Sequence, residues 1–310
     1  MTANSMETQE TVYHIPALLP QTLDALDIKP GGVYVDCTYG GGGHSRAIVE
    51  QLDASGHLYG FDQDRDAVAN AMTDSRFTMV LSNFRYLVNF MRYHDVDAVD
   101  GVLADLGVSF HHFDDPDRGF SFRFPEGDLD MRMNRNGRLT AADVVNTYDV
   151  DRLTTIFKLY GEMSQARRLA QAIVKARAAA PLTTVQQLLD TVGPLINPRQ
   201  TKKEMAQLFQ ALRIEVNDEI GALRQLLQSA LTVLRPGGRL VVITYHSLED
   251  RLVKNFMRTG NLDGSDNRDF YGRSLAPMRM LTSKPVVADD DEVLRNPRSR
   301  SAKLRAAVKL

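Results

Sequence analysis

The chain of 310 residues contains a single cysteine, Cys37. One cysteine excludes an internal disulfide and a zinc site built from several thiolates, and its scarcity is typical of a reducing cytosol. Long hydrophobic runs are missing too, since none approaches the roughly 20 residues that span a bilayer. Residues 1–11 lack the basic and apolar segments of a secretion signal. We therefore expect a cytoplasmic protein with no membrane partner.

An excess of charge of either sign is also absent, because 37 lysines and arginines face 39 aspartates and glutamates. No global basic field indicates a polyanionic partner, so binding to nucleic acid would depend on local patches. Internal repeats and low-complexity segments are lacking as well. With 43% hydrophobic and 25% charged residues, the chain is typical of a globular protein with one large domain, or a domain with an insertion.

The most informative stretch is Val33 to Ser45, which reads Val-Tyr-Val-Asp-Cys-Thr-Tyr-Gly-Gly-Gly-Gly-His-Ser. β-favouring residues run into four glycines and an amphipathic segment follows, which predicts a strand, a tight turn and a helix. Glycines let the main chain approach a ligand closely, and the N–H groups at the helix start turn toward it. The pattern predicts a nucleotide-type cofactor site, with a ligand-free tight turn as the alternative.

Asp62 lies twenty residues after Gly42, at the end of the apolar stretch 57–61. A carboxylate there can accept both hydroxyls of an unphosphorylated ribose. Two classes of enzyme fit, a dinucleotide-dependent dehydrogenase and an S-adenosylmethionine (AdoMet) methyltransferase. The dehydrogenase motif requires glycine where Ser45 stands, and His44 would crowd a pyrophosphate. AdoMet has no phosphate, so the pattern favours the methyltransferase.

Apolar and amphipathic segments alternate as far as Asp105, which predicts a parallel, doubly wound α/β sheet. The expected strands are 33–37, 57–61, 77–81 and 99–104, and the expected helices are 44–52, 66–72 and 85–93. The strand pattern returns only at 239–245, after a helix at 218–234 that ends in Arg-Pro-Gly-Gly. Further strands are expected at 278–282 and 301–308.

The segment between these two parts of the sheet has helical periodicity instead. Its expected helices are 141–145, 151–159, 165–180, 185–192 and 203–216. Such an insertion is large enough for a small core of its own. We therefore expect a disordered segment 1–12, a cofactor-binding domain of 13–115 and 206–310, and an inserted loop and helical domain, 116–205, that recognises the substrate.

Taken together, these motifs resemble those of the bacterial 16S rRNA cytosine-N4 methyltransferase family, also called MraW or RsmH. The motifs are Asp36-Cys-Thr-Tyr-Gly-Gly-Gly-Gly-His-Ser, Asp62-Gln-Asp, Asp105-Leu-Gly-Val-Ser, Arg118-Gly-Phe-Ser-Phe, Leu129-Asp-Met-Arg-Met, Phe209-Gln-Ala-Leu-Arg-Ile, His246-Ser-Leu-Glu-Asp-Arg and Asn296-Pro-Arg-Ser-Arg-Ser. The resemblance implies a class I, Rossmann-like AdoMet-dependent methyltransferase sheet with an inserted helical domain. It also implies methylation of the exocyclic N4 amine of a cytosine in the decoding (P-site) region of 16S rRNA.

The resemblance assigns the cofactor contacts as well. They fall on Gly42, Gly43, His44, Asp62, Phe84, Asp105 and His112. Asp105 follows the fourth strand, where a doubly wound fold gathers its site residues. It could accept a hydrogen bond from the target amine or hold the ammonium group of AdoMet.

We predict Asp105, Tyr245 and His246 as catalytic residues, because each lies at the carboxyl end of an expected strand. For the stretch after Tyr245, a capping box formed by Ser247 and Asp250 is the structural alternative. Cys37 also lies at a strand end, which favours a small buried residue over a covalent nucleophile.

Local basic segments are the candidate RNA contacts. One is the acid-free run Arg295, Arg298, Arg300, Lys303, Arg305 and Lys309, and the other interleaves Arg118, Phe120, Phe122, Arg123 and Phe124. Phosphates suit the first, and stacked or flipped bases suit the second, although its phenylalanines could equally be core. The expected partner is 16S rRNA in the small ribosomal subunit. No metal is predicted, and a homodimer is left open.

Two other functions stay open. One is a non-catalytic AdoMet- or RNA-binding ribosome-assembly factor that keeps the fold, and the other is a Rossmann dehydrogenase.

Overall fold

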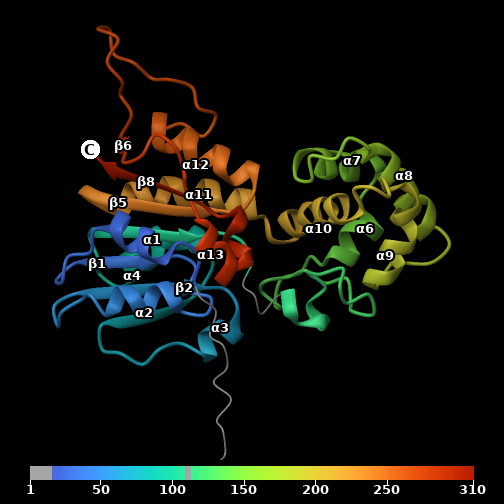
Figure 1. The fold of residues 1–310 in the computed structure, drawn as a ribbon, viewed down its shortest axis with the longest axis horizontal. Coiled ribbons are helices and arrows are strands. Elements are labelled where there is room, and N and C mark those ends of the chain that lie inside the picture. The colour runs from blue at the N-terminus through green and yellow to red at the C-terminus, as the bar shows by residue number, and fades with distance from the viewer. Residues whose placement is uncertain (1–15, 109–112) are drawn as a thin grey trace, which may run out of the picture.

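The computed structural model describes residues 16–108 and 113–310, which form a lobe built around a sheet and a second, helical lobe (Figure 1). The predicted contact His112 and the expected disordered segment 1–12 lie outside the described residues. Among the residues that are described, no helix is both long enough and apolar enough to cross a membrane.

Within the described residues, one sheet of eight strands has the order β3-β2-β1-β4-β5-β8-β6, and β7 pairs with β8. The strands are β1 (Val33–Asp36), β2 (His57–Asp62), β3 (Phe77–Leu81), β4 (Val99–Asp105), β5 (Leu234–Thr244), β6 (Met278–Met280), β7 (Val286–Val287) and β8 (Lys303–Lys309). The strands β1 to β5 pair in parallel, as predicted. β8 is antiparallel to β5, β6 and β7, which corrects the expected all-parallel sheet at one edge. A long connection separates β5 from β8, and β8 then runs in the opposite direction to β5.

β5 also begins earlier than expected, at Leu234 rather than Arg239. Leu234 pairs with Val99 and Arg239 pairs with Gly101, so the Arg-Pro-Gly-Gly segment is a bulge inside the strand. Gly237, at φ +81°, takes the left-handed conformation that this bulge requires.

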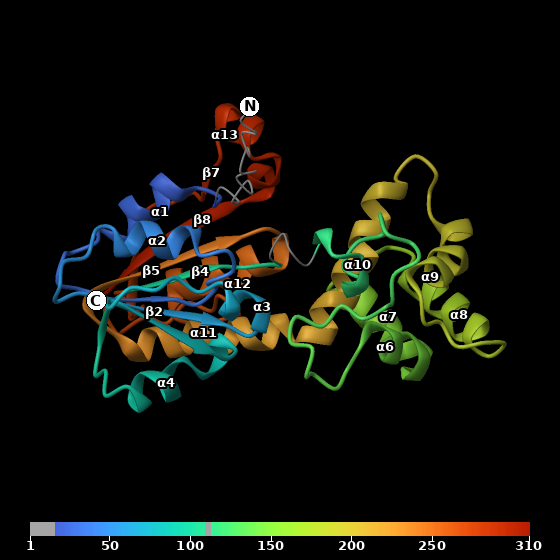
Figure 2. The same ribbon diagram turned by 90° about the horizontal axis from the view of Figure 1, so that it is seen from below.

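Helices cover both faces of the sheet (Figure 2). They are α1 (Leu19–Leu26), α2 (Gly43–Val49), α3 (Arg65–Ala69), α4 (Leu87–Tyr93), α11 (Glu219–Val233), α12 (Ser247–Thr259) and α13 (Asp290–Arg295), with 3₁₀ turns η1 (Phe84–Tyr86), η2 (Pro116–Arg118) and η4 (Pro297–Ser301). Alternate residues of a strand serve opposite faces. In β4, Val102 and Ala104 pack with α4, α11 and α12, whereas Leu103 packs with α1 and α2. Both faces are thus buried, as the near-continuous apolar strands predicted.

The helical lobe has a separate hydrophobic core. Its elements are α6 (Ala141–Thr147), α7 (Val150–Leu159), α8 (Ala166–Arg177), α9 (Val185–Val192), η3 (Gly193–Leu195) and α10 (Thr201–Asn217). α10 runs across the expected boundary between residues 205 and 206, and its buried Leu208, Phe209 and Leu212 belong to the helical core. The chain therefore returns to the sheet lobe at the junction of α10 and α11, around Asp218.

Candidate active site at the carboxyl ends of the strands

The four-glycine turn joins β1 to α2. Gly42 precedes α2 at φ +74°, and a Cβ placed on it would lie 2.6 Å from the hydroxyl oxygen of Tyr39. Gly43 is the first residue of the helix, and a Cβ on it would lie 3.0 Å from the ring of Pro16. Backbone conformation and close packing therefore both require glycine at Gly42, and close packing disfavours a larger residue at Gly43.

Asp36, the last residue of β1, connects the strand to this turn and to the start of α2 through hydrogen bonds. Its buried carboxylate accepts hydrogen bonds from Ser45 Oγ at 2.7 Å and from the backbone N–H of Thr38 at 3.0 Å. Burial raises the pKa of Asp36, and the bonds from Ser45 and Thr38 oppose that rise. Asp36 begins the glycine-rich motif but was not predicted as a site residue, although a carboxylate at the end of a buried strand is a usable signal.

Asp62 ends β2 and is bound to the same turn. Its Oδ2 accepts a hydrogen bond from the N–H of Gly40 at 2.9 Å, and its Oδ1 accepts one from the N–H of Asp64 at 2.9 Å. The predicted ribose carboxylate thus lies beside the glycine turn with its orientation fixed by backbone donors.

Asp105 ends β4, on the other side of β1, and its side chain is 21% exposed. Its Oδ1 accepts a hydrogen bond of 2.8 Å from the hydroxyl of Tyr245, and its Oδ2 lies 3.7 Å from Nδ1 of His44. Burial raises the pKa of Asp105 to about 6, while His44 and Tyr245 limit the rise and the Asp36 and Glu249 carboxylates add to it. Three predicted site residues therefore meet here, from β4, from α2 and from the end of β5.

His44 is buried, and its Nε2 lies 3.1 Å from the carbonyl oxygen of Ala17. Burial lowers the pKa of His44, against the opposing effects of Asp105 and the Ala17 carbonyl. A neutral imidazole at this position donates its Nε2 proton to the carbonyl and leaves Nδ1 beside Asp105.

Phe84, another predicted cofactor contact, begins η1 after β3. It is half-buried and packs against the core beneath α4 and α11. The preceding Asn83 donates a 3.0 Å hydrogen bond to Oε1 of Gln63, the residue after Asp62. Phe84 is thus tied to the loop that carries the predicted ribose carboxylate.

His246 is the N-cap of α12, and the helix has no side-chain cap, so the capping box of Ser247 and Asp250 is wrong. Asp250 instead pairs with Arg305 in β8 at 2.6 Å. Buried Glu249 organises the helix start, since it accepts a 3.1 Å hydrogen bond from the N–H of Tyr245 and lies 3.2 Å from Nε2 of His246. Nδ1 of His246, by contrast, has no hydrogen-bond partner among the described residues.

A metal-type donor set, Glu219, His246 and Glu249, also gathers here, with ligand atoms within 4.8 Å of one another. However, Arg213 donates to both carboxylate oxygens of Glu219, at 2.8 and 2.9 Å. A guanidinium thus already supplies positive charge to this cluster, which disfavours a metal cation beside it. Sequence reasoning missed Glu219, Glu249 and Arg213, because these side chains come together only through the packing of α10, α11 and α12.

Some residues of the two predicted RNA-binding segments make structural contacts, whereas Arg123, Arg295 and Arg300 are exposed. Arg118 and Phe120 are buried, and Phe122 makes an edge contact with Phe209 in the helical core, with ring centroids 5.6 Å apart. In the C-terminal run, Arg305 is buried against Asp250, and Lys309 donates to two backbone carbonyls. The reason in each case is a distant partner that the local pattern does not reveal.

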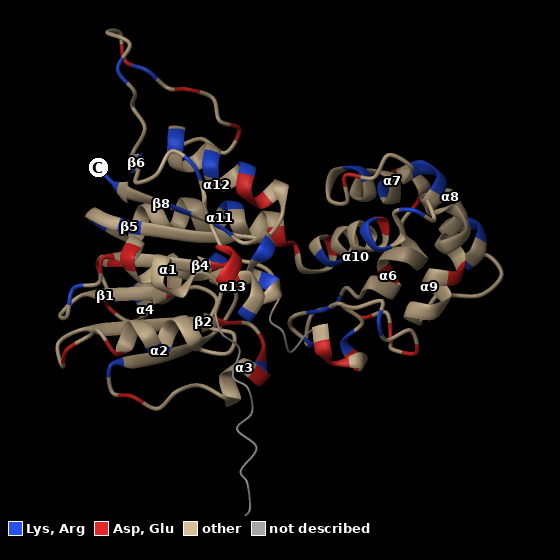
Figure 3. Cartoon of the chain, in the orientation of Figure 1, with Lys and Arg blue, Asp and Glu red and all other residues tan. Residues whose placement is uncertain are grey.

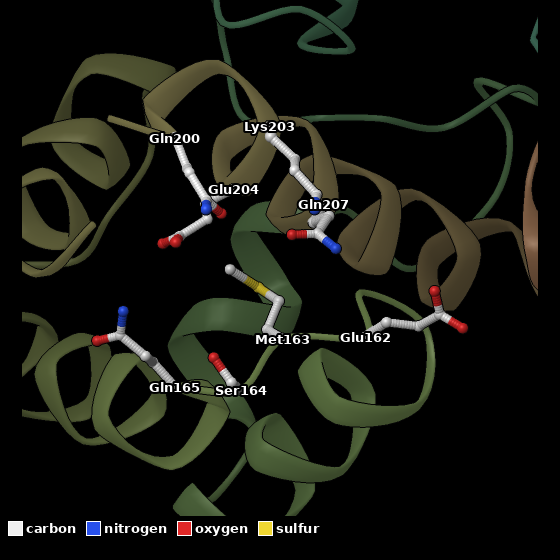
Figure 4. Close-up of a pocket in the computed structure, with 8 residues that line it drawn as sticks. All are labelled: Glu162, Met163, Ser164, Gln165, Gln200, Lys203, Glu204 and Gln207. Carbon is white, nitrogen blue, oxygen red and sulfur yellow. The ribbon is translucent and has the colours of Figure 1, made fainter. Parts of the chain in front are cut away.

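The helical lobe also has a hollow of about 140 Å³ between α10 and the segment before α8 (Figure 4). Polar groups dominate its lining, which comprises Glu162, Met163, Ser164, Gln165, Gln200, Lys203, Glu204 and Gln207. It contains none of the predicted catalytic or cofactor-binding residues.

Comparison with known proteins gives a consistent result. Residues 11–310 match the model of the MraW methylase family. The ribosomal RNA small subunit methyltransferase H of Phocaeicola vulgatus is 58% identical over 304 residues, which cover 98% of this chain and 100% of the relative. The protein of that name from Porphyromonas gingivalis (strain ATCC 33277) is 57% identical over 306 residues, covering 97% of this chain and 98% of the relative.

Among solved structures, an rRNA methylase from Streptococcus thermophilus matches at 11% identity with a TM-score of 0.43, over 96% of this chain and 99% of that chain. At that score the likeness is too weak to carry a conclusion.

Proposed function

Because the chain belongs to the MraW methylase family, we propose that it is an AdoMet-dependent methyltransferase of small-subunit rRNA. The proposed target is the exocyclic N4 amine of a cytosine in the decoding region. The observation that most supports this function is the position of Asp105, whose carboxylate lies beside the glycine turn and has a pKa of about 6. It offers a proton acceptor at the place where a doubly wound fold binds its ligands.

The groups around the glycine turn fit AdoMet. Asp62 and Asp105 end the two strands that pair with β1 on either side. Carboxylates suit a ligand with a ribose diol and an ammonium group, and a phosphate would be repelled by them. Asp62 would hold the ribose, and Gly42 and Gly43 would let the main chain lie close to the ligand. When bound, AdoMet supplies an electrophilic methyl group.

Asp105 is suited to accept the proton that the amine loses. The lone pair of a cytosine N4 is delocalised into the ring, so the amine must be oriented and deprotonated as the new bond forms. A carboxyl group with a pKa of about 6 is ionised at neutral pH, yet it is a stronger base than an ordinary aspartate. The hydroxyl of Tyr245 donates to one oxygen of this carboxylate and so fixes its orientation. His246, with both ring nitrogens buried, is the second candidate acceptor.

A covalent mechanism through Cys37 is disfavoured. Its side chain is 1% exposed and packs in the core between the sheet and α4, α11 and α12. Burial raises the pKa of the Cys37 thiol well above its usual range, so the nucleophilic thiolate is scarce.

The helical lobe is the proposed RNA-binding part. Exposed basic residues lie along α8 and around the start of α10 (Figure 3). They are Arg167, Arg168, Lys175, Arg199, Lys202 and Lys203. Folded RNA is recognised mainly through shape and phosphate contacts, and the target base must be turned out toward the strand ends.

The test is methylation of purified small ribosomal subunits with isotopically labelled AdoMet, followed by nucleoside analysis by mass spectrometry. We expect N4-methylcytidine at one rRNA position. The appearance of 5-methylcytidine would overturn the amine chemistry. AdoMet binding without methylation of unmodified subunits would favour the non-catalytic assembly factor, and binding of NAD in place of AdoMet would favour the dehydrogenase.

A further inference from the structure

Arg118 is the largest fully buried side chain among the described residues, with 1% of its surface exposed. A buried guanidinium loses its hydration, so it persists only where charge and hydrogen bonds compensate for the loss. Arg118 lies at the end of η2, in the segment that leads into the helical lobe. Its partners therefore show what this position holds together.

Those partners come from both lobes. Nη1 lies 3.2 Å from Oδ2 of Asp64, which is also buried and follows β2. Nη2 donates to the carbonyl oxygens of Arg132 and Met133, each at 3.0 Å, in the loop before α6. One planar fork thus bridges the loop after β2 and the entrance to the insertion.

Asp64 is linked in turn to the predicted cofactor site. Its N–H donates to Oδ1 of Asp62 at 2.9 Å, and Oδ2 of Asp62 accepts the N–H of Gly40 at 2.9 Å. A continuous series of short contacts therefore runs from Arg118 through Asp64 and Asp62 to the glycine turn. A second contact supports it, since Nε2 of Gln63 lies 3.3 Å from Sδ of Met133.

We propose that Arg118 is a positioning residue for AdoMet, one that holds Asp62 in place through Asp64 and joins the cofactor site to the base of the RNA-binding lobe. The proposal rests on the proposed function and adds a residue that contacts neither substrate. Arg118 fixes the loop after β2, and that loop sets the direction of the Asp62 carboxylate. Loss of the Arg118–Asp64 pair therefore weakens AdoMet binding.

The experiment measures AdoMet affinity by titration calorimetry for the full-length protein and for Arg118→Met, Asp64→Asn and the double variant. Asn keeps the cap that Asp64 provides for α3, where its side chain accepts the N–H of Asp66. It removes the nearer of the two carboxylates that face Arg118, since Oδ2 of Asp66 lies 3.7 Å from the same Nη1. We expect each single variant to raise the Kd at least about tenfold, roughly the effect of one lost charge-assisted hydrogen bond. The double variant should be no worse than either single one, because the two residues act as one pair.

Arg132→Met is the matched control. The guanidinium of Arg132 also donates to a carboxylate, that of Asp130, and to a backbone carbonyl, that of Gly137. Its side chain makes no hydrogen bond with Asp64. Its AdoMet affinity should stay within about twofold of the wild type, because Arg118 contacts only the backbone carbonyl of Arg132, which methionine keeps.

Steady-state kinetics with ribosomal subunits distinguish positioning from general damage. A positioning role raises the KM for AdoMet much more than it lowers kcat, whereas partial unfolding lowers kcat through loss of active protein. Unchanged affinity in folded Arg118→Met, or an equal loss in Arg132→Met, overturns the inference. If Arg118→Met does not fold, the AdoMet affinity of Asp64→Asn is compared with that of Arg132→Met, and the same criteria apply. A wild-type protein that fails to bind AdoMet instead removes the proposed function itself.

Discussion

The two lobes use charge in opposite ways. At the strand ends of the sheet lobe, Asp36, Asp62 and Asp105 are partly or fully buried, hydrogen-bonded, and set around one glycine turn. In the helical lobe the charges outside the entrance loop are mostly exposed, and α8 and α10 carry an exposed set of basic residues. Burial raises the pKa values of Asp36 and Asp105, whereas exposed charges are screened by solvent and salt. The difference supports the proposal that the sheet lobe carries the chemistry and the helical lobe binds a polyanion.

The cores are equally distinct. The helical lobe has its own apolar cluster, which includes the buried residues of α6 to α10, while two clusters cover the two faces of the sheet. Several contacts between the lobes are polar, such as Arg85 with Asp218 at 3.0 Å and Arg118 with Asp64 at 3.2 Å, although Val108 after β4 also packs against the helical core. Variants in one lobe should therefore affect one function and spare the other, except at these contacts.

Asp105→Asn is the sharpest test of the sheet lobe. The amide keeps the shape but cannot accept a proton, so methylation should fall by about 10²- to 10⁴-fold. Stability should rise, since the pKa of Asp105 is raised from 3.8 to about 6, which corresponds to about 3 kcal/mol of unfavourable burial at neutral pH. Single-turnover methylation and thermal melting measure the two effects.

Asp100→Asn is the control, because Asp100 lies in the same strand at its opposite end and binds the N–H of Val33. It should leave the rate nearly unchanged. Full activity in folded Asp105→Asn would remove this carboxylate from the mechanism. If Asp105→Asn loses AdoMet binding as well as methylation, Asp105 is assigned to binding the ammonium group of AdoMet instead.

Charge reversal tests the helical lobe. Replacement of Arg168, Lys175, Lys202 and Lys203 by glutamate should lower methylation of ribosomal subunits by about 100-fold or more, because phosphate contacts dominate RNA affinity. The AdoMet Kd should stay within about twofold, since no predicted cofactor contact lies in this lobe. Filter binding of the subunits and calorimetry with AdoMet give the two readouts.

Four reversals on the sheet lobe, Lys29→Glu, Arg92→Glu, Lys254→Glu and Arg258→Glu, control for the change of net charge. All four residues are exposed. An equal loss of subunit binding in this control would show a general charge effect and break the division between the lobes.

Much of the sheet lobe is predictable because its signals are local. β1 to β4 follow from apolar runs between turn residues, and Asp62 and Asp105 follow from their places directly after such runs. The antiparallel β8 was not predicted, since pairing direction depends on how the chain returns and not on the strand's own residues.

The interaction between the lobes was the least predictable part. Arg118 sits among phenylalanines in a pattern typical of base-stacking segments, yet it is buried against Asp64, 54 residues earlier in the chain. Glu249 likewise faces His246 and the N–H of Tyr245, where the structural alternative predicted from the sequence was a capping box. Burial of a charge depends on a partner brought by the fold, and sequence spacing does not encode it.

Asp62→Ala sharpens the assignment within the sheet lobe. The variant loses a charge-assisted hydrogen-bond acceptor, so AdoMet binding should weaken by about 1.5 to 3 kcal/mol, roughly 10- to 150-fold in Kd. Affinity for ribosomal subunits should not change. Asp53→Ala, at an exposed carboxylate that binds Ser55, is the control. Unchanged AdoMet affinity in folded Asp62→Ala would contradict the ribose assignment.

The pH dependence gives a smaller effect with a defined sign. If ionised Asp105 accepts the proton, the rate should rise through about pH 6 and level off above it, so that pH 5 gives about a tenfold loss. Stability should change in the opposite direction. Because the folded-state pKa is raised, the contribution of Asp105 is fully present below pH 3.8 and is lost as pH rises through about 6. Nearby His44, Asp36 and Glu249 also act on this group, so the difference between wild type and Asp105→Asn isolates its share.

Cys37→Ser should have the smallest effect on the methylation rate. It tests whether the sheet lobe uses a thiol nucleophile in addition to its carboxylates. Cys37 follows β1 directly, and its N–H bonds the carbonyl oxygen of Leu103, a contact that serine keeps. A buried hydroxyl in place of a thiol costs about 1 to 3 kcal/mol of stability if it finds no partner. The methylation rate per folded molecule should nevertheless stay within about twofold, because direct attack by the amine needs no thiolate. Cys37→Ala separates polarity from reactivity, since it removes the sulfur without adding a hydroxyl. If both variants fold, bind AdoMet and still fail to methylate the subunits, a covalent step through Cys37 replaces proton transfer to Asp105 as the central chemistry of this lobe.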